Sequence, residues 1–519
     1  MRFRFLIFLL LSFTLVSGQH FGRMAVKAKT GPTPGGSPSA ATYTDIVYYS
    51  TVHAWLFKPE GYDDNSNDYP FIIFMPGYGE EDSHGTFANV NNSGAGIGYS
   101  LLRKANSSGS PQWEDDRFLI AVLNNTSGDF GTNHFDDIMD YMDAQGYRVD
   151  LNRVYVTGLS GGAIGCDLIM AGRYAEIAGV VPVSGPSFDN ATEWSHYDNK
   201  GFFQYHGTSD GTFGLTIGGS LYWANGNFGA WVERTPAPRA RYIYGQGHSS
   251  AVWYTAVYNP VTKVDDWPSY LLKFSLDTDE RATSFVEFAE SSEDITDYRE
   301  ARNQVAQMAG GAPKTALEGR LATLLTTINK GGVRYLVSFQ HGSIGSITDT
   351  YDSYNIMTSF TTSATLSNIV DVTGGASTVD LIVTNQFAST NRDGNTSANN
   401  ALRMNAFGLN YKANLAGLRL ETGTTNGYMT ISGIPTGKSV DIIVHHHHEA
   451  GQDDGSAITA ESTIWTSVNS VVQTQYSAYN STDYIIYEGI PEVAGVITVG
   501  MKPNSTREVL VTSYELVIY

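Results

Sequence analysis

The sequence predicts an α/β domain built on a doubly wound, mostly parallel sheet, followed by a C-terminal all-β sandwich. From Tyr43 to about Leu276, short apolar strands alternate with segments of helical spacing. Several strands, such as Phe71–Met75 and Phe118–Leu123, are continuous apolar runs, as expected where helices cover both faces of a parallel sheet. From residue 333 onward, Thr, Ser, Val, Ile and Asn dominate between turn signals, which is typical of a sandwich.

The individual strands follow the apolar runs. In the first domain we expect them at Ile46–Phe57, Phe71–Met75, Phe118–Leu123, Val154–Thr157, Val180–Val183, Phe202–Tyr205 and Arg241–Tyr244. Phe135–Gln145 has helical spacing just before the strand at Val154, and this βαβ rhythm indicates parallel pairing. In the second domain we expect strands that include Val379–Thr384, Tyr428–Ile431, Val440–Val444, Val496–Val499 and Val509–Ile518.

The N-terminus has the pattern of a secretory signal. Arg2 and Arg4 precede an apolar run too short to span a bilayer, and Ser17 and Gly18 are small residues at its end. We therefore expect a signal peptide at residues 1–18, cleaved after Gly18, and a secreted or periplasmic protein. No later stretch reaches the ~18 apolar residues of a membrane span.

The rest of the chain divides by composition. Residues 19–42 are rich in Gly, Pro and Ser and predict a flexible leader, and residues 43–276 form the α/β domain. Residues 277–330 predict one or two connecting helices, broken at Gly310–Pro313 and packed on the first domain. Residues 331–519 form the sandwich. The single cysteine, Cys166, excludes an intramolecular disulfide, which in a large secreted chain favours a bacterial protein.

Composition excludes several classes of function. The 519 residues carry a formal net charge of −20, which argues against binding nucleic acid or anionic lipid. Forty-one per cent of the residues are hydrophobic, enough to build packed cores, so a mostly disordered chain is excluded. The composition therefore indicates an acidic globular protein of several domains.

A nucleophile motif follows the strand at Val154–Thr157. Gly158, Ser160 and Gly162 form Gly-x-Ser-x-Gly, with a β-branched strand before it and a small-residue helix start after it. The motif alone is weak in a glycine-rich chain, but this strand–turn–helix context is the one that a nucleophile elbow requires. The glycines allow the tight turn that exposes the serine hydroxyl.

A serine hydroxyl needs a base, and the chain supplies an acid and a histidine in the expected order. Asp210 follows the strand Phe202–Tyr205, and His248 follows the strand Arg241–Tyr244, so both lie at carboxyl ends of strands, where open α/β sheets bind ligands. Asp189 is a reserve candidate for the acid. His206 is interpreted instead as closing a turn through hydrogen bonds at a strand end.

The oxyanion donors are expected beside the serine. The apolar strand Phe71–Met75 ends in a glycine-rich turn, where the backbone N–H of Tyr78 could face the substrate oxygen together with that of Gly161.

Four segments resemble secreted α/β-hydrolase esterases of the polyhydroxybutyrate-depolymerase-like and feruloyl or acetyl-xylan carbohydrate esterase group. They are Pro70–Glu80, Val149–Gly162, His206–Asp210 and Gly247–Tyr258. The resemblance implies the α/β-hydrolase fold over residues 43–276. Residues 331–519 resemble, by pattern and composition, sandwich modules appended to secreted esterases, which are often carbohydrate-binding.

The resemblance also implies roles for single residues. Matched to the family's motifs are Ser160 as nucleophile, Asp210 as acid, His248 as base, Tyr78 and Gly161 as oxyanion donors, and Trp253 as a substrate-binding aromatic. Met75-Pro76 stands where the family has Leu-His.

No metal or organic cofactor is expected. His445–His448 lie where a strand runs into a loop, and an extended chain sends alternate imidazoles to opposite faces, which disfavours chelation of one ion. Asp453–Asp454 alone are a weak signal for calcium.

Taken together, these residues predict a serine ester hydrolase that removes acyl or feruloyl groups from plant polysaccharides. An appended binding module suggests a polymeric substrate, because a second site raises local concentration. The alternatives are a polyester depolymerase, a serine peptidase on the same triad, and a non-catalytic glycan-binding protein with a degenerate hydrolase domain. The sequence leaves the acyl group, the ligand of the sandwich and the oligomeric state open.

Overall fold

The computed structural model of the chain describes most of both domains. The described residues are 42–50, 52–78, 117–124, 129–185, 195–207, 209–213, 239–243, 245–339, 355–357, 364–385, 388–389, 418–420, 427–448, 462–468, 471–477, 484–502 and 509–519. The expected signal peptide and nearly all of the leader lie outside these segments. Within them, no helix is both long and apolar enough to cross a bilayer.

The first domain is built on one mixed sheet of eight strands. They are β1 (Thr42–Tyr49), β2 (Val52–Lys58), β3 (Tyr69–Met75), β4 (Leu119–Asn124), β5 (Val149–Leu159), β6 (Gly179–Val183), β7 (Gly201–Gly207) and β8 (Arg239–Ile243). Their order is β1-β2-β4-β3-β5-β6-β7-β8, with β1 and β2 antiparallel to their neighbours. Every pair from β4 to β8 is parallel, so the predicted mostly parallel sheet is confirmed.

One predicted strand is wrong. The run Ile46–Phe57 forms two strands, because β1 ends at Tyr49 and β2 returns antiparallel from Val52. Ser50 reverses the chain with a φ of 54°, a left-handed conformation that is uncommon outside glycine. The sequence here has no Gly, Pro or Asn to signal the turn, so the apolar run reads as continuous.

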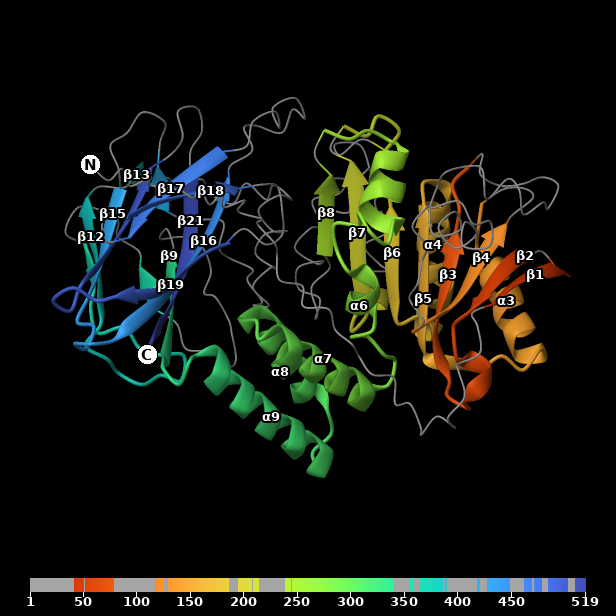
Figure 1. Ribbon diagram of the computed structural model, residues 1–519, viewed down its shortest axis with the longest axis horizontal. Helices are drawn as coiled ribbons and strands as arrows, with labels where there is room; N and C mark the ends of the chain where they lie inside the picture. The colour runs from red at the N-terminus through yellow and green to blue at the C-terminus, as the bar shows by residue number, and fades with distance from the viewer. Residues whose placement is uncertain are drawn as a thin grey trace, which may run out of the picture.

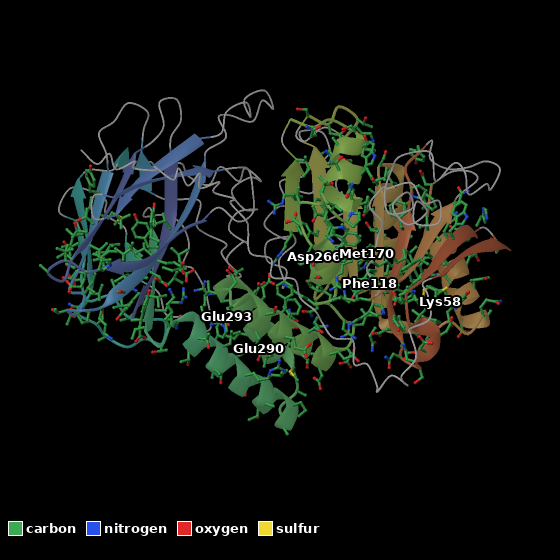
Figure 2. All side chains as sticks on the ribbon, viewed as in Figure 1. Lys58, Phe118, Met170, Asp266, Glu290 and Glu293 are labelled. Carbon is green, nitrogen blue, oxygen red and sulfur yellow. The ribbon has the colours of Figure 1, made fainter. Side chains whose placement is uncertain are left out.

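Helices cover both faces of this sheet. Alternate residues of β3 enter two different cores, Phe71 and Ile73 one of them, Ile72 and Phe74 the other. The first core includes side chains of α3 (Thr132–Ala144) and α4 (Gly161–Arg173); the second includes those of α6 (Trp267–Leu271) and of the helices that follow. Phe118 and Met170, labelled in Figure 2, belong to opposite cores. Short 3-10 turns also lie at Tyr62–Asp64, at Tyr174–Glu176 and at residues 195–197.

The connecting segment contains three helices, not the one or two expected. They are α7 (Thr278–Ser292), α8 (Ile295–Gln307) and α9 (Ala312–Ile328). Glu293 turns the chain at φ 51°, and Asp294 then caps α8 by accepting a hydrogen bond from the N–H of Thr296 at 2.7 Å. The expected break at Gly310–Pro313 separates α8 from α9. Figure 1 shows these helices between the two β-containing parts.

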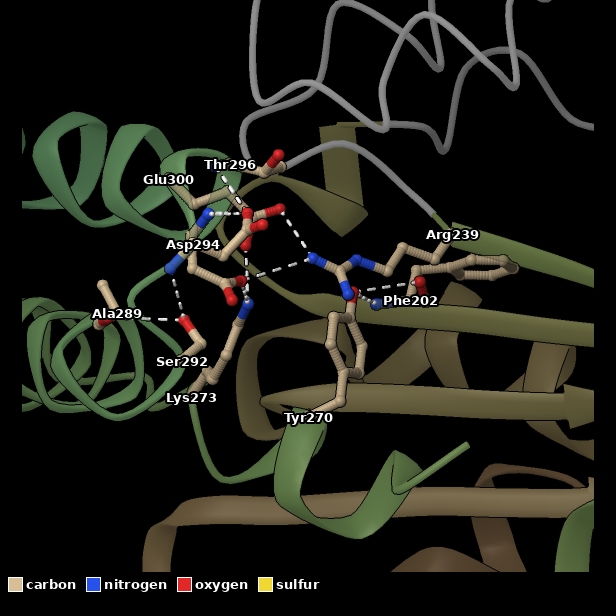
Figure 3. A network of polar contacts seen from close by, with 10 residues as sticks. Phe202, Arg239, Tyr270, Lys273, Ala289, Ser292, Asp294, Thr296 and Glu300 are labelled. Carbon is tan, nitrogen blue, oxygen red and sulfur yellow. Dashed lines mark hydrogen bonds and ion pairs between the residues drawn. The ribbon is translucent and has the colours of Figure 1, made fainter. Parts of the chain in front are cut away.

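Helix α8 makes ion pairs with both domains through two adjacent charged residues, Arg299 and Glu300. Glu300 accepts hydrogen bonds from Lys273 Nζ at 2.6 Å and from Arg239 at 3.1 Å, in the network drawn in Figure 3. Arg299 faces the second domain and makes a bidentate pair with Glu515 at 2.8 and 3.0 Å. Burial opposes the ionisation of Glu300, but the two cations outweigh it and lower the pKa of this carboxyl. The connecting segment therefore packs on the first domain, as expected, and its helix α8 is also ion-paired to the second domain.

The described residues of the C-terminal region form strands in two sheets, which confirms the predicted β class for this part of the chain. Its strands are β9 (Val333–Phe339), β10 (Asn355–Met357), β11 (Thr365–Leu366), β12 (Asp380–Asn385), β13 (Ala388–Ser389), β14 (Leu418–Leu420), β15 (Gly427–Ser432), β16 (Ser439–His448), β17 (Ser462–Val468), β18 (Val471–Ser477), β19 (Tyr484–Pro491), β20 (Ile497–Lys502) and β21 (Val509–Ile518). One sheet runs β11-β12-β15-β20-β17-β18. In the other, β21 pairs with β9, β14 and β16, and only β9–β10 is parallel. Buried residues of both sheets, such as Leu381 and Leu516, form one core.

The four consecutive histidines belong to strand β16. Pairing with β21 continues through His448, past the end expected at Val444. The side chains of these four histidines lie outside the described ones, and among the side chains that are described no group of three or more His, Cys, Asp or Glu could hold a metal ion.

Candidate active site

Ser160 occupies a strained turn between β5 and α4. Its backbone has φ 52° and ψ −112°, a sparsely populated region for a residue with a side chain. The turn is held by its N–H, which donates to the carbonyl of Val183 at 2.9 Å, and by its carbonyl, which accepts from Ala163 at 3.0 Å. Strain of this kind persists only where the surrounding structure enforces it, and it is concentrated at functional sites.

The two glycines of the motif are required by close backbone contacts. A Cβ on Gly162 would lie 2.0 Å from the carbonyl oxygen of Met75 at the end of β3. A Cβ on Gly158 would lie 2.5 Å from the carbonyl oxygen of Gly162. Side chains are thus excluded where β3, β5 and α4 meet, and this is the physical reason for glycine on either side of Ser160.

The structure brings Ser160, His248 and Asp210 together at the carboxyl ends of the parallel strands. Asp210 follows β7 and His248 follows β8. His248 Nδ1 lies 2.8 Å from Asp210 Oδ2, and His248 Nε2 lies 2.8 Å from Ser160 Oγ. Because a carboxylate can only accept, Nδ1 carries the proton and Nε2 is free to accept the proton of the serine hydroxyl. The arrangement can activate Ser160 as a nucleophile.

Asp210 is held as a carboxylate by hydrogen bonds from several directions. Its Oδ1 accepts from the backbone N–H groups of Thr212 and Phe213, each at 2.9 Å. Burial opposes its ionisation, but the bonds from His248 and from Phe213 outweigh this and lower the pKa of Asp210. The acid is therefore charged and oriented, as a partner for an imidazolium must be.

Two aromatic rings contact the imidazole of His248 edge-on. Trp253 lies 5.0 Å from it between ring centroids at 71°, and Phe213 lies 5.6 Å away at 61°. Such tilted contacts stabilise a ring in one orientation. The expected role of Trp253 in substrate binding stays a prediction. Phe213 was not a candidate in the sequence; the only signal was its place three residues after Asp210, at the end of an Asp-Gly turn.

Tyr78 and Gly161, the expected oxyanion donors, lie side by side. A Cβ on Gly161 would be 3.0 Å from ring atoms of Tyr78, whose side chain is 53% exposed. Within the described residues, neither backbone N–H donates a hydrogen bond to a backbone carbonyl. Their role as an oxyanion hole remains a prediction, because a carbonyl oxygen has to occupy the space between them.

A π-helix follows the loop that carries His248 and is hydrogen-bonded to β5, the strand that precedes Ser160. It covers Ala251–Tyr258, three residues after His248, and includes Trp253. Tyr258 hydroxyl lies 2.8 Å from Thr157 Oγ1 on β5. π-Helices are rare and concentrated at functional sites, and hydrophobic periodicity did not indicate this one.

Of the two alternative residues that the sequence analysis considered, the structure describes His206 but not Asp189. His206 bonds through Nε2 to the carbonyl oxygen of Phe213 at 2.6 Å, as the turn-closing interpretation requires. Asp189 lies outside the described residues.

Comparisons with known proteins found similarity in structure only. No protein-family model matches the chain, and no curated protein matches its sequence. Similar solved structures include a thermostable esterase, at 15% identity and TM-score 0.30, covering 46% of this chain and 63% of that one. A ferulic acid esterase has 15% identity and TM-score 0.31, with 43% and 97% covered. A feruloyl esterase module from Clostridium thermocellum has 12% identity and TM-score 0.31, with 43% and 86% covered. At these TM-scores the likenesses decide neither activity nor substrate.

Proposed function

We propose that the chain is a serine hydrolase of carboxylic esters with the α/β-hydrolase fold. The observation that carries the proposal is the continuous relay from Ser160 Oγ through His248 to Asp210, with both hydrogen bonds at 2.8 Å. The strained backbone at Ser160 supports it independently, because an ordinary turn has no need of such a conformation.

The geometry supports a two-step reaction. His248 Nε2 takes the proton of Ser160 as Oγ attacks the ester carbonyl, and the backbone N–H groups of Tyr78 and Gly161 stabilise the oxyanion. The alcohol leaves with the proton that His248 returns, and an acyl-serine remains. Water then attacks the acyl group and gives its proton to His248, which restores the Ser160 hydroxyl and releases the acid. Asp210 holds the imidazole and stabilises its charge throughout.

We further propose a secreted carbohydrate esterase that acts on acylated or feruloylated plant polysaccharide. Support comes from the signal-like N-terminus, the resemblance of the four motif segments, and the second domain, whose two sheets share one core in the manner of a sandwich module. A polymer-binding module would hold the substrate near Ser160 and raise its local concentration. Trp253 contributes an aromatic surface beside the base.

The test is a substrate panel on the wild-type chain and Ser160→Ala. We expect hydrolysis of p-nitrophenyl acetate and of methyl ferulate or acetylated xylan, all lost in Ser160→Ala. Preferred turnover of polyhydroxybutyrate or of peptides would move the substrate class to a polyester depolymerase or a peptidase on the same triad. Retained labelling of Ser160→Ala by a fluorophosphonate would refute the nucleophile itself.

A further inference from the structure

A second histidine, His206, stands beside the acid of the relay. It is the sixth residue of β7, its exposed fraction is 0%, and its Nε2 lies 3.7 Å from Asp210 Oδ2. The hydrolytic reaction proposed above makes no use of it. A buried imidazole next to the carboxylate of Asp210 would add a positive charge beside the relay if it took a proton, so we establish its protonation from its hydrogen bonds.

The contacts of His206 determine its tautomer. Nε2 lies 2.6 Å from the carbonyl oxygen of Phe213, which can only accept, so Nε2 carries the proton. Nδ1 has no hydrogen-bond partner within the described part of the chain. Burial lowers the pKa of His206, although Asp210 opposes this, so the ring is held neutral. The two histidines around Asp210 therefore carry their protons on opposite nitrogens.

The bond from His206 orients two groups through one residue. Phe213, whose carbonyl accepts from His206, also donates its backbone N–H to Asp210 Oδ1 at 2.9 Å. The ring of Phe213 contacts His248 at 5.6 Å. The hydrogen bond from His206 therefore fixes Phe213, whose backbone N–H donates to Asp210 and whose ring contacts His248.

We propose that His206 is a positioning residue of the hydrolytic relay, which acts as a neutral Nε2–H donor that fixes Phe213 against Asp210 and His248. This inference rests on the proposed function. For this role the side chain at position 206 needs an N–H at the place of Nε2 but none at the place of Nδ1, because Nδ1 has no partner among the described residues.

The test compares His206→Gln with His206→Asn in the full chain. A glutamine amide can place an N–H near the Nε2 position, whereas the shorter asparagine amide occupies the Nδ1 position. For p-nitrophenyl acetate we expect His206→Gln to keep kcat within about 3-fold of wild type. His206→Asn should lose roughly 10- to 100-fold in kcat with KM within about 2-fold, because the relay and not the substrate site is displaced.

A spectroscopic readout separates positioning from loss of fold. The downfield proton resonance of His248 Nδ1–H should persist in His206→Gln and shift or broaden in His206→Asn, at a temperature where near-UV circular dichroism shows both variants folded. Equal activity of the two variants, or an unchanged resonance in His206→Asn, would overturn the proposal. Activity that survives in Ser160→Ala would instead overturn the proposed function, so the two failures are distinguishable.

Discussion

Replacing Gly162 by alanine tests the elbow most directly. The added Cβ would lie 2.0 Å from the carbonyl oxygen of Met75, whereas real Cβ contacts essentially never fall below 3.0 Å. The atoms that the Cβ would meet belong to the backbone of Met75 and Pro76, which cannot rotate away as a side chain can. The end of β3 and the start of α4 must therefore separate by about 1 Å. Ser160, two residues earlier, would move with the turn.

The magnitude follows from the geometry of the relay. A misplacement of about 1 Å costs on the order of 10²-fold in rate, or about 2.7 kcal/mol of barrier, because Oγ leaves hydrogen-bond reach of His248. Overpacking should also lower the free energy of unfolding by about 1–3 kcal/mol. We expect kcat/KM for p-nitrophenyl acetate to fall by ~10²-fold, measured on folded protein and corrected by fluorophosphonate titration of competent sites.

A matched control is the same substitution at Gly319. This glycine lies in α9, and nothing is within 4 Å of the place that an added Cβ would take, so alanine meets no obstacle there. Gly319→Ala should leave kcat/KM unchanged and stabilise the helix by about 0.5–1 kcal/mol. If Gly162→Ala matched wild type in turnover and melting temperature, the reasoning from close packing at the elbow would be wrong.

Three further outcomes are expected. Asp210→Asn should lower kcat by about 10³- to 10⁴-fold in initial-rate assays, because the amide no longer orients or stabilises a protonated imidazole; turnover near wild type would shift the acid elsewhere. Glu515→Gln should lower the free energy of unfolding by about 3–5 kcal/mol in denaturant titration, because Arg299 and Arg334, bound to Glu515 at 2.8 and 2.7 Å, would lose the buried carboxylate that pairs with both of them; an unchanged midpoint would contradict this. Because burial lowers the pKa of His206, its neutral form contributes stability that is complete above about pH 6.5, the unfolded value, and is lost as pH falls through the lower folded pKa. His206→Gln should lack that part of the pH dependence, and equal slopes below about pH 6.5 would refute it.

Much of the fold was predictable because its signals are local. Continuous apolar runs identified most strands of the parallel sheet, and Val509–Ile518 was predicted to the residue. The predictions failed where the chain turns without Gly, Pro or Asn, as at Ser50, and where the cap Asp294 starts a new helix within a charged segment. Tertiary contacts stabilise such turns, so the local sequence pattern does not predict all of them.

The sequence named candidates for the site but not their surroundings. Ser160, Asp210 and His248 follow strands in a recognisable order, and the structure places these three candidates within hydrogen-bond distance of one another. Phe213 and the π-helix at Ala251–Tyr258 contribute through packing and carry no motif. What they do depends on which side chains lie across from them, and the local sequence does not contain that information.

The sequence alone determined that Gly158 and Gly162, on either side of Ser160, have no side chain, and this allows the close approach of backbones that the turn requires. The tertiary structure alone decided that His248, 88 positions away, reaches that turn. The reason is the order of parallel strands, which sets β5, β6, β7 and β8 in sequence across the sheet and so gathers their carboxyl-end loops at one edge.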